Sequence, residues 1–208
     1  MNKIFLYSDQ EIPENSKIDN ILFEEVKSKN ISLAYIPSKS DPLRKYFNKK
    51  ISYYKKYNIN NFLYFDLGDE WNANKKDDLF KCDIIHLAGG DTYRLLYNLN
   101  KRKMVSELIK YVNKGGVLVG ISAGAIVLTP KIDIIYITEQ FDRNKINKLS
   151  TLELVNFEFF PHYENKYDSL IKDYCKKNNT IVFACRDGDG IFINDNKVNL
   201  IGNIKIFA

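Results

Sequence analysis

The segment with the clearest chemical potential is GGVLVGISAGAIVLTP, residues 115–130. An apolar run over 117–121 leads into the motif GISAG at 120–124, and an apolar stretch with helical periodicity follows. This is a GxSxG pattern between a strand and a helix, the context in which the serine becomes an exposed nucleophile on a sharp turn. We therefore predict that Ser122 is a nucleophile. The alternative is a glycine-rich turn that contains an incidental serine.

The small residues around Ser122 explain how such a turn could form. A nucleophile on a sharp turn has strained backbone angles and crowds the preceding strand, so glycine or alanine is needed at the flanking positions. The backbone N–H of Ala123, in the first turn of the helix, would then point toward the oxygen of a reacting carbonyl group. We predict this amide as one donor of an oxyanion hole.

A serine nucleophile needs a base, and the chain contains only 2 histidines. His86 lies inside the apolar run 84–87, where a hydrogen-bonded core or near-site position is the simplest interpretation. His162 follows an expected strand and Pro161, and the carboxyl ends of strands are where α/β folds form their sites. We predict His162 as the general base, with a structural turn histidine as the alternative.

A second turn between an expected strand and helix is LAGGDT at 87–92, which carries paired glycines. Glycines let a backbone N–H face a ligand with no side chain in the way. A phosphate-binding loop is the competing interpretation, but neither GxGxxG nor GxxxxGK[ST] occurs in the sequence. We predict the N–H of Gly90 as the second oxyanion donor, beside that of Ala123.

An α/β framework would position these residues. Short runs of β-branched and aromatic residues alternate with segments of helical periodicity, which predicts a three-layer α/β sandwich on a mostly parallel sheet. The expected strands are 3–8, 32–37, 61–65, 83–87, 116–121 and 152–160; the expected helices are 41–57, 75–80, 91–113 with a break near Arg102, a short one after 121, and 164–177. Turn signals within 180–208 predict antiparallel hairpins that close one edge of the sheet.

The composition is that of a globular protein and limits the classes of function. Of the 208 residues, 45% are hydrophobic, 27% charged and 13% aromatic, which excludes disordered, collagen-like and coiled-coil chains. We expect a single domain over residues 1–208, because no shift in composition marks a boundary. The formal net charge of +5 is modest for this length and identifies no partner.

One basic and aromatic segment, RKYFNKKISYYKK at 44–56, has a composition that can bind nucleic acid. At helical spacing, however, Leu43, Tyr46, Phe47 and Ile51 form one apolar stripe. The lysines then take the solvent face of an amphipathic helix. We favour this interpretation and expect no nucleic-acid partner.

The termini and the cysteines exclude further classes. No window reaches the roughly 18 apolar residues that a membrane span needs, and the first residues lack the apolar region of a signal peptide. We expect a cytoplasmic location and no membrane partner. Cys82, Cys175 and Cys185 lack CxxC spacing, so neither a disulfide framework nor a zinc site is predicted.

Three motifs in the same chain order resemble the peptidase E (dipeptidase E, aspartyl dipeptidase) family of serine peptidases. They are LAGGDTYRLL at 87–96, GGVLVGISAGAIVLTP at 115–130 and FFPHY at 159–163. The family belongs to the class I glutamine amidotransferase-like group, and cyanophycinase is a relative. The resemblance implies that fold, a serine-type exopeptidase activity on short peptides, and no metal or organic cofactor. It leaves open whether the chain forms a homodimer.

The resemblance also implies the roles of the site residues. Ser122 would be the nucleophile and His162 the base, and the amides of Gly90 and Ala123 would form the oxyanion hole. The family places an acidic residue between the serine and the histidine in the chain. Asp133, Glu139 and Asp142 all lie there, and the usual separation from the serine favours Glu139. Its carboxylate would accept the Nδ1–H of His162 and stabilise the imidazolium.

The expected substrate follows from the resemblance only in part. Aspartyl-specific members carry a basic cluster after the histidine, whereas this chain reads YENKYDSLIKDY at 163–174 and has no arginine there. Lys166 and Arg186 are the candidate cations for a substrate carboxylate. A serine esterase or amidase of small molecules, and a non-catalytic binding protein on the same scaffold, are the alternatives to a dipeptidase-like enzyme.

Overall fold

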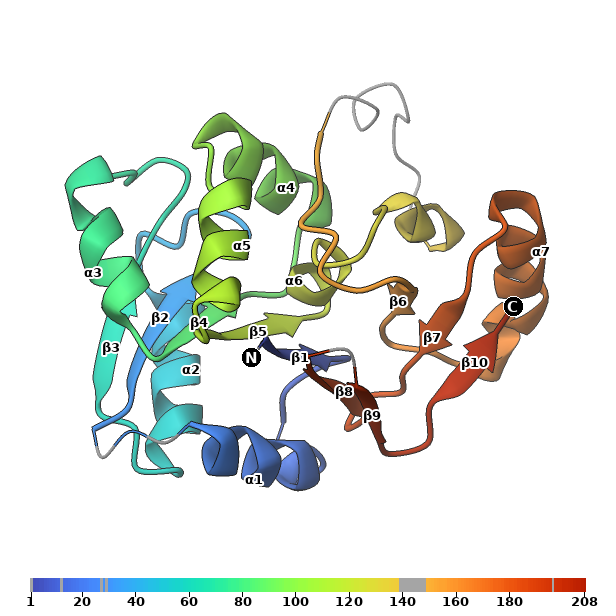
Figure 1. Cartoon of the computed structure of the whole chain (residues 1–208), viewed down its shortest axis with the longest axis horizontal. Helices are drawn as coiled ribbons and strands as arrows, with labels where there is room; N and C mark the ends of the chain where they lie inside the picture. The colour runs from blue at the N-terminus through green and yellow to red at the C-terminus, as the bar shows by residue number, and fades with distance from the viewer. Residues whose placement is uncertain (1, 12, 27, 29, 139–148, 196) are drawn as a thin grey trace.

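The computed structural model describes all residues except 1, 12, 27, 29, 139–148 and 196 (Figure 1). The described elements, in chain order, are β1 (Lys3–Tyr7), α1 (Ser16–Glu25), β2 (Ser32–Ile36), α2 (Lys45–Lys55), β3 (Asn61–Tyr64), η1 (Ala73–Lys75), α3 (Lys76–Lys81), β4 (Ile84–Leu87), α4 (Thr92–Lys101), α5 (Val105–Asn113), β5 (Val117–Ile121), α6 (Ala123–Ile126), η2 (Asp133–Ile137), β6 (Glu158–Phe160), η4 (Asn165–Tyr167), α7 (Asp168–Asn178), β7 (Val182–Ala184), β8 (Gly190–Asn194), β9 (Lys197–Ile201) and β10 (Lys205–Phe207). Here α denotes an α-helix, η a 3-10 helix and β a strand.

The central sheet has seven strands in the order β3-β2-β4-β5-β1-β8-β9. The first five are parallel, whereas β8 and β9 form an antiparallel hairpin that adds to β1. The prediction of a mostly parallel sheet closed at one edge by antiparallel strands is confirmed. Because parallel strands end at the same edge, the carboxyl ends of β1, β4 and β5 lie side by side there.

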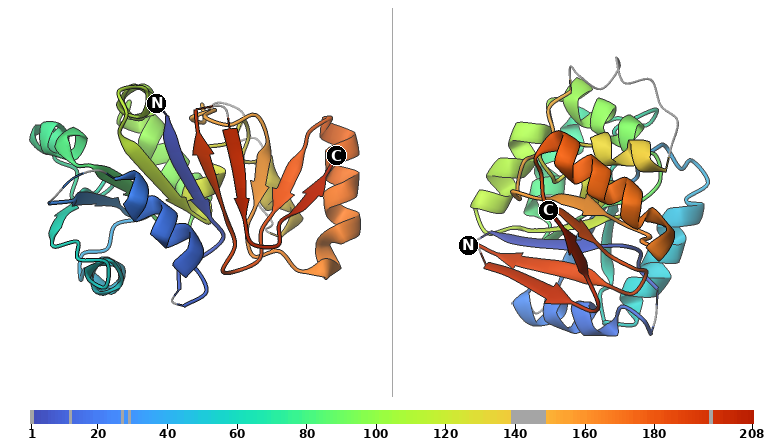
Figure 2. Two further views of the ribbon diagram at one scale, coloured as in Figure 1. Left: turned by 60° about the horizontal axis from the view of Figure 1, so that its bottom comes forward. Right: turned by 90° about the vertical axis from the view of Figure 1, so that its right-hand side faces the viewer.

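Helices cover both faces of this sheet, which gives the expected three layers (Figures 1 and 2). Buried side chains of α1 and α2 pack with Phe5, Tyr35 and Val119 on one face. On the other face, buried side chains of α3, α4, α5 and α6 pack with Ile4 and Leu118. Alternate strand residues therefore enter two separate cores, as they must in a sheet that is buried on both sides.

Residues near the carboxyl terminus also build a second sheet, which the sequence analysis did not predict. It has three strands in the order β10-β7-β6 and lies with α7 at the opposite end of the molecule from α3 (Figure 1). The expected strand 152–160 is reduced to Glu158–Phe160. The preceding residues follow α6 instead, since the amides of Leu152 and Leu154 bond to the carbonyl oxygens of Val127 and Leu128 at 3.0 and 2.8 Å.

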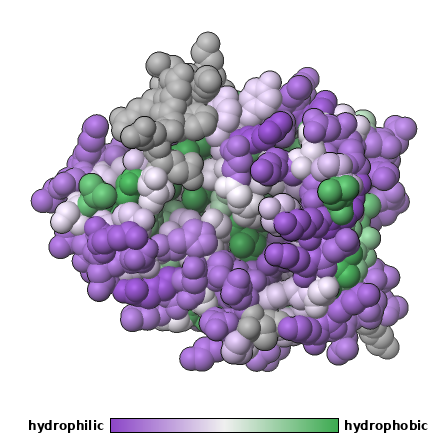
Figure 3. Space-filling model, turned by 180° about the vertical axis from the view of Figure 1, so that it is seen from behind, coloured by the Kyte–Doolittle hydropathy of each residue, from purple (hydrophilic) through white to green (hydrophobic). Residues whose placement is uncertain are grey.

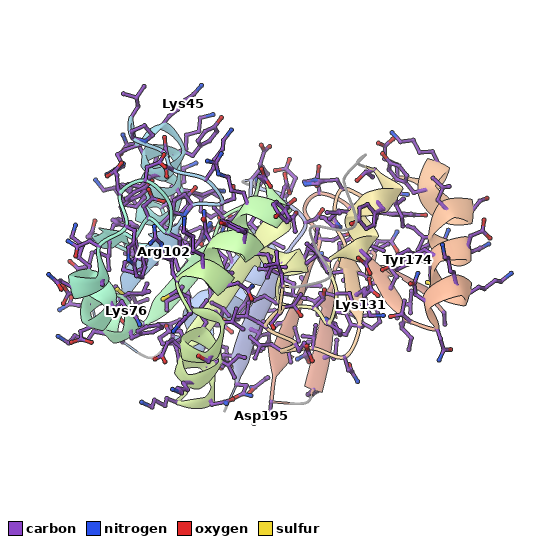
Figure 4. The ribbon with its side chains drawn as sticks, turned by 90° about the horizontal axis from the view of Figure 1, so that it is seen from above. Lys45, Lys76, Arg102, Lys131, Tyr174 and Asp195 are labelled. Carbon is purple, nitrogen blue, oxygen red and sulfur yellow. The ribbon has the colours of Figure 1, made fainter. Side chains whose placement is uncertain are left out.

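One helix was missed by the sequence-based prediction, and one predicted helix break is present. The helix α1 was not predicted, although Ile18 and Leu22 are four residues apart and both fully buried. The predicted break near Arg102 is confirmed, because Lys103 has a positive φ of 56° between α4 and α5. Arg102, labelled in Figure 4, stabilises the chain at this break. Its guanidinium group donates hydrogen bonds to the carbonyl oxygens of Leu67 and Gly68 at 3.0 and 3.2 Å.

The segment 44–56 forms the amphipathic helix α2, and the predicted apolar stripe is confirmed in part, because Phe47 and Ile51 pack in the core of this face whereas two other members do not. Phe47 and Tyr54 are buried, whereas Leu43 and Tyr46 are 86% and 53% exposed. Lys45 extends into solvent from the outer side of this helix (Figure 4). Seen from behind, the molecule has a mostly hydrophilic surface with small apolar areas (Figure 3). No helix of the described residues is long and apolar enough to cross a membrane.

Candidate active site

Ser122 sits on a strained turn between β5 and α6. Its φ of 49° and ψ of −108° are rare for a residue with a side chain, and such strain persists only where the surroundings hold it. The neighbouring glycines allow the turn to pack. A Cβ atom on Gly124 would lie 2.1 Å from the carbonyl oxygen of Leu87 in β4, and one on Gly120 would lie 2.5 Å from the carbonyl oxygen of Gly124. The GxSxG spacing is therefore a steric requirement of this turn.

His162 lies next to this serine. Its Nε2 atom is 2.9 Å from the Oγ atom of Ser122. The residue follows β6 and Pro161, and its own φ of 54° turns the ring toward the edge where β5 ends. Its backbone N–H donates to the Oγ atom of Ser8, at the end of β1, over 2.7 Å. The fold thus brings together two residues that are 40 positions apart in sequence.

The carboxylate that meets His162 belongs to Asp187, in the turn between β7 and β8. Its Oδ1 atom lies 2.6 Å from the Nδ1 atom of His162. The same oxygen accepts a hydrogen bond from the Ser8 hydroxyl at 2.9 Å. Ser8 is fully buried, and its hydroxyl oxygen contacts both His162 and Asp187. A continuous chain of hydrogen bonds therefore runs from Ser122 through His162 to Asp187.

Asp187 is not among the residues predicted for this position from the sequence. Of the three candidates, Glu139 and Asp142 lie outside the described residues. Asp133 lies in η2 and lines a different cavity with Tyr174. One sequence signal for this acid is the Asp-Gly turn after β7, which the sequence pattern predicts only as a hairpin turn. A second signal is the expected antiparallel tail, because a strand added beside β1 carries its preceding turn to the carboxyl edge of the sheet.

His86, the other histidine, is fully buried in β4. Its Nδ1 atom lies 2.8 Å from the hydroxyl oxygen of Tyr54, and its ring stacks on that of Tyr35. Burial lowers the pKa of His86 well below its usual value, so the ring is neutral. These contacts agree with the hydrogen-bonded core interpretation.

The glycine pair of the second turn adjoins the nucleophile. A Cβ atom on Gly89 would lie 3.5 Å from the Cβ atom of Ser122. Gly90 has a φ of +119°, a conformation that favours glycine. The next residue, Asp91, caps α4 by accepting the N–H of Arg94 at 2.8 Å. The turn therefore holds its backbone close to Ser122 at the start of a helix.

Two cavities meet at these residues, and both are lined by Gly90, Ser122 and His162. The larger, of about 550 Å³, extends toward α2, and many residues with polar side chains line it: Ser8, Asp9, Gln10, Glu11, Ser38, Lys39, Asp41, Tyr46, Lys49, Lys50, His86 and Asp91. The smaller, of about 230 Å³, has a mixed lining that includes Thr92 and Thr138 beside Ile126, Ile134, Ile135, Phe160, Pro161 and Tyr167. A substrate could therefore extend to both sides of Ser122.

Neither of the cations proposed from the sequence lines these two cavities. The Nζ atom of Lys166 is bound to a carboxylate oxygen of Glu164 at 2.6 Å. The guanidinium of Arg186 donates to the side-chain oxygen of Asn165 at 2.6 Å and lies over the ring of Tyr163. The larger cavity contains Lys39, Lys49 and Lys50 instead. Among the residues that the structure describes, no group of histidine, cysteine and acidic side chains could hold a metal ion.

Removing the Ser8 hydroxyl should weaken this arrangement without unfolding the protein. In Ser8→Ala, Asp187 and the N–H of His162 each lose one partner, so we expect kcat to fall about tenfold and KM to change little. Steady-state kinetics would measure the effect. Ser52→Ala is the matched control, because that hydroxyl is exposed on α2 and bonds only to its own helix. Equal rates for Ser8→Ala and Ser52→Ala would show that Ser8 does not position the site.

Comparison with known proteins identifies relatives of this chain. The profile of Peptidase family S51 matches residues 4–201. An uncharacterized peptidase of Pasteurella multocida is 31% identical over 101 residues, which are 48% of this chain and 49% of that protein. A protein named Peptidase E from Nostoc sp. is 28% identical over 159 residues, 68% of this chain and 64% of the relative. These matches span about half to two thirds of the relatives' own length.

Solved structures are similar over nearly the whole chain. A putative Peptidase E protein from Listeria monocytogenes superposes with a TM-score of 0.74 and 22% identity, covering 96% of this chain and 98% of that one. A peptidase from an acI-B1 Actinobacterium gives a TM-score of 0.71 with 18% identity, covering 99% and 89%. At these identities the likeness establishes the fold.

Proposed function

Because the chain belongs to peptidase family S51, we propose that it is a serine exopeptidase that hydrolyses short peptides. The observation that carries the proposal is the chain of hydrogen bonds from Ser122 through His162 to Asp187. A nucleophile, a base and an acid that orients the base are the three groups that acyl transfer by a serine requires. We assign Asp187 as the acid in place of Glu139. The Peptidase E names of the relatives agree with a dipeptidase-like activity.

In the proposed mechanism, the Nε2 atom of His162 accepts the proton of Ser122 while Oγ attacks the carbonyl carbon of the scissile bond. Asp187 accepts the Nδ1–H, which holds the tautomer that leaves Nε2 free and stabilises the imidazolium. The imidazolium then protonates the leaving amine, whose departure leaves an acyl-enzyme. His162 activates a water molecule that hydrolyses this ester and restores the serine.

The developing negative charge on the substrate oxygen needs donors that are already in place. We propose the amides of Gly90 and Ala123, which flank Ser122 at the starts of α4 and α6. Two observations support this role: a side chain at Gly89 would touch the Cβ atom of Ser122, and Gly90 has a positive φ, so the backbone beside the nucleophile carries no side chain. A donor of this kind contributes about 10²- to 10³-fold to kcat in serine peptidases.

The proposal is tested by covalent labelling with a fluorophosphonate together with a substrate panel. We expect the wild-type protein to be labelled on Ser122, as located by peptide mass spectrometry, and to hydrolyse dipeptides. The panel pairs dipeptides with p-nitrophenyl esters. Rapid ester cleavage without any peptide turnover would indicate an esterase, and an unlabelled Ser122 without turnover would indicate a non-catalytic binding protein.

A further inference from the structure

The larger cavity is lined by four carboxylates, and two of them already serve the fold. Asp41 accepts the N–H groups of the first residues of α2, Lys45, Tyr46 and Phe47, at 3.0, 2.8 and 3.2 Å. Asp91 caps α4 in the same way. These two charges are satisfied by helix amides. The remaining carboxylates are those of Asp9 and Glu11, which follow β1.

Asp9 has no ion-pair partner among the described lysine and arginine residues. It is half-buried, and one of its oxygens accepts the N–H of Gly188 at 3.1 Å. Within the described part of the chain, no lysine or arginine nitrogen lies within 4.0 Å of it. Burial raises the pKa of Asp9, and the negative charges of Asp187 and Glu11 add to this increase. A positively charged ligand would relieve both effects.

Gln10 adds an unused acceptor to the same cavity. The residue is only 5% exposed, and its Nε2 atom donates to the hydroxyl of Tyr54 at 3.0 Å. That hydroxyl in turn lies 2.8 Å from His86, so the carboxamide is held in one orientation. Its Oε1 atom has no hydrogen-bond partner among the described residues. A buried carbonyl oxygen without a partner is a site where a ligand N–H gains a hydrogen bond.

The lysines of the cavity do not occupy this position. Lys50 is the nearest, and its Nζ atom donates to the main-chain carbonyl oxygen of Gln10 at 3.1 Å. Burial lowers the pKa of Lys50 to about 8, and the negative charges of Asp9 and Glu11 oppose this decrease, so the ammonium group stays mostly protonated at pH 7 while its hydrogen bond goes to Gln10 and not to Asp9. Lys39 and Lys49 are exposed. The carboxylate of Asp9 and the Oε1 atom of Gln10 therefore remain available to a ligand.

We propose that Asp9 and the Oε1 atom of Gln10 bind the α-ammonium group of the substrate, so that the enzyme acts on peptides with a free amino terminus. This inference rests on the proposed peptidase function. An ammonium group has three N–H donors and one positive charge, and these match a carboxylate beside a neutral carbonyl oxygen.

The proposal also explains why a single amino-terminal residue would be released. Asp9 directly follows Ser8, whose hydroxyl contacts Asp187 and accepts the N–H of His162. The anchor thus adjoins the residue that contacts His162 and Asp187, and it lines the same cavity as Ser122. A substrate held at its amino group presents its first peptide bond to the serine. The leaving residue then enters the smaller cavity on the other side.

Binding to a Ser122→Ala protein tests the anchor without turnover. The ligands are Ala-Leu, whose leucine can pack on the isoleucine side chains of the smaller cavity, and N-acetyl-Ala-Leu, which lacks the positive charge. Titration followed by NMR measures both Kd values, including millimolar ones. We expect acetylation to weaken binding at least about tenfold. Adding Asp9→Asn should weaken Ala-Leu binding about 10- to 100-fold and leave N-acetyl-Ala-Leu unchanged.

Glu11→Gln is the matched control, because it removes an exposed carboxylate of the same cavity two residues away. It should keep the preference for the free amine. The proposal is overturned if the two ligands bind equally, if the preference survives Asp9→Asn, or if neither ligand binds. A failure of the peptidase function would be seen separately, as an unlabelled Ser122 and no hydrolysis by the wild-type protein, neither of which this titration uses.

Discussion

Replacing Ser122 with alanine should lower kcat for dipeptide hydrolysis by about 10⁴-fold or more. The reason is that the attacking atom is removed: His162 reaches the Oγ atom at 2.9 Å, and without that atom we expect only direct attack by water. KM should change little, because the hydroxyl is a small part of the surface that binds substrate. The residual activity would reflect binding and the oxyanion donors alone.

Progress curves at high enzyme concentration would measure so low a rate, and the fold can be checked independently. Alanine is compatible with the Ser122 backbone to the same extent as serine, because both carry a Cβ atom at the positive φ. The thermal midpoint should therefore stay within a few degrees of wild type, corresponding to less than about 1 kcal/mol. A folded Ser122→Ala protein with kcat within tenfold of wild type would remove Ser122 from the mechanism.

The parts of the fold that could be predicted from sequence are those with a local physical cause. The Ser122 turn is one, because Gly120 and Gly124 are required by contacts within a short stretch and its neighbouring strand. The break at Arg102 and the buried parallel strands are others, since their signals lie within a few residues. The alternation of these elements then favoured the correct fold class.

The start of α2 shows where local periodicity fails. Leu43 and Tyr46 fit the apolar stripe by spacing, but Arg44 has a positive φ of 55°, so Leu43 precedes the helix and lies outside its face. Tyr46 borders the larger cavity, where an aromatic ring is exposed to a potential ligand. The stripe that packs in the core keeps Phe47 and Ile51 and adds Tyr54. Phe47 and Tyr54 pack against β2 and β4.

The acid beside His162 could not be found from local sequence at all. Asp187 and Ser8 are 179 positions apart, and they meet only because β8 pairs antiparallel with β1. The same holds for the second sheet, in which β6 and β7 are joined through α7. Such long-range pairing depends on which strands become neighbours in the fold. Several short strands near the carboxyl terminus have similar sequence patterns, so the pattern alone does not select the pairing partner of each strand.

Replacing Asp187 with asparagine should lower kcat by about 10⁴-fold, an effect close to that of losing the serine. An asparagine side chain can donate its N–H to the Nδ1 atom of His162, which now lies 2.6 Å from the carboxylate. The imidazole would then carry its proton on Nε2 and could not accept the proton of Ser122. The shape of the site stays the same, so KM should change little and the fold should be retained.

The labelling rate of Ser122 by a fluorophosphonate reports the same step without any peptide, and we expect it to fall in parallel with kcat. Asp173→Asn is the control, because it neutralises an exposed carboxylate on α7 that does not contact His162. If Asp187→Asn kept near-wild-type kcat and labelling, the carboxylate would have to come from elsewhere in the chain. Glu139→Gln would then be the next variant to measure. If Asp187 is the acid, Glu139→Gln should leave kcat unchanged.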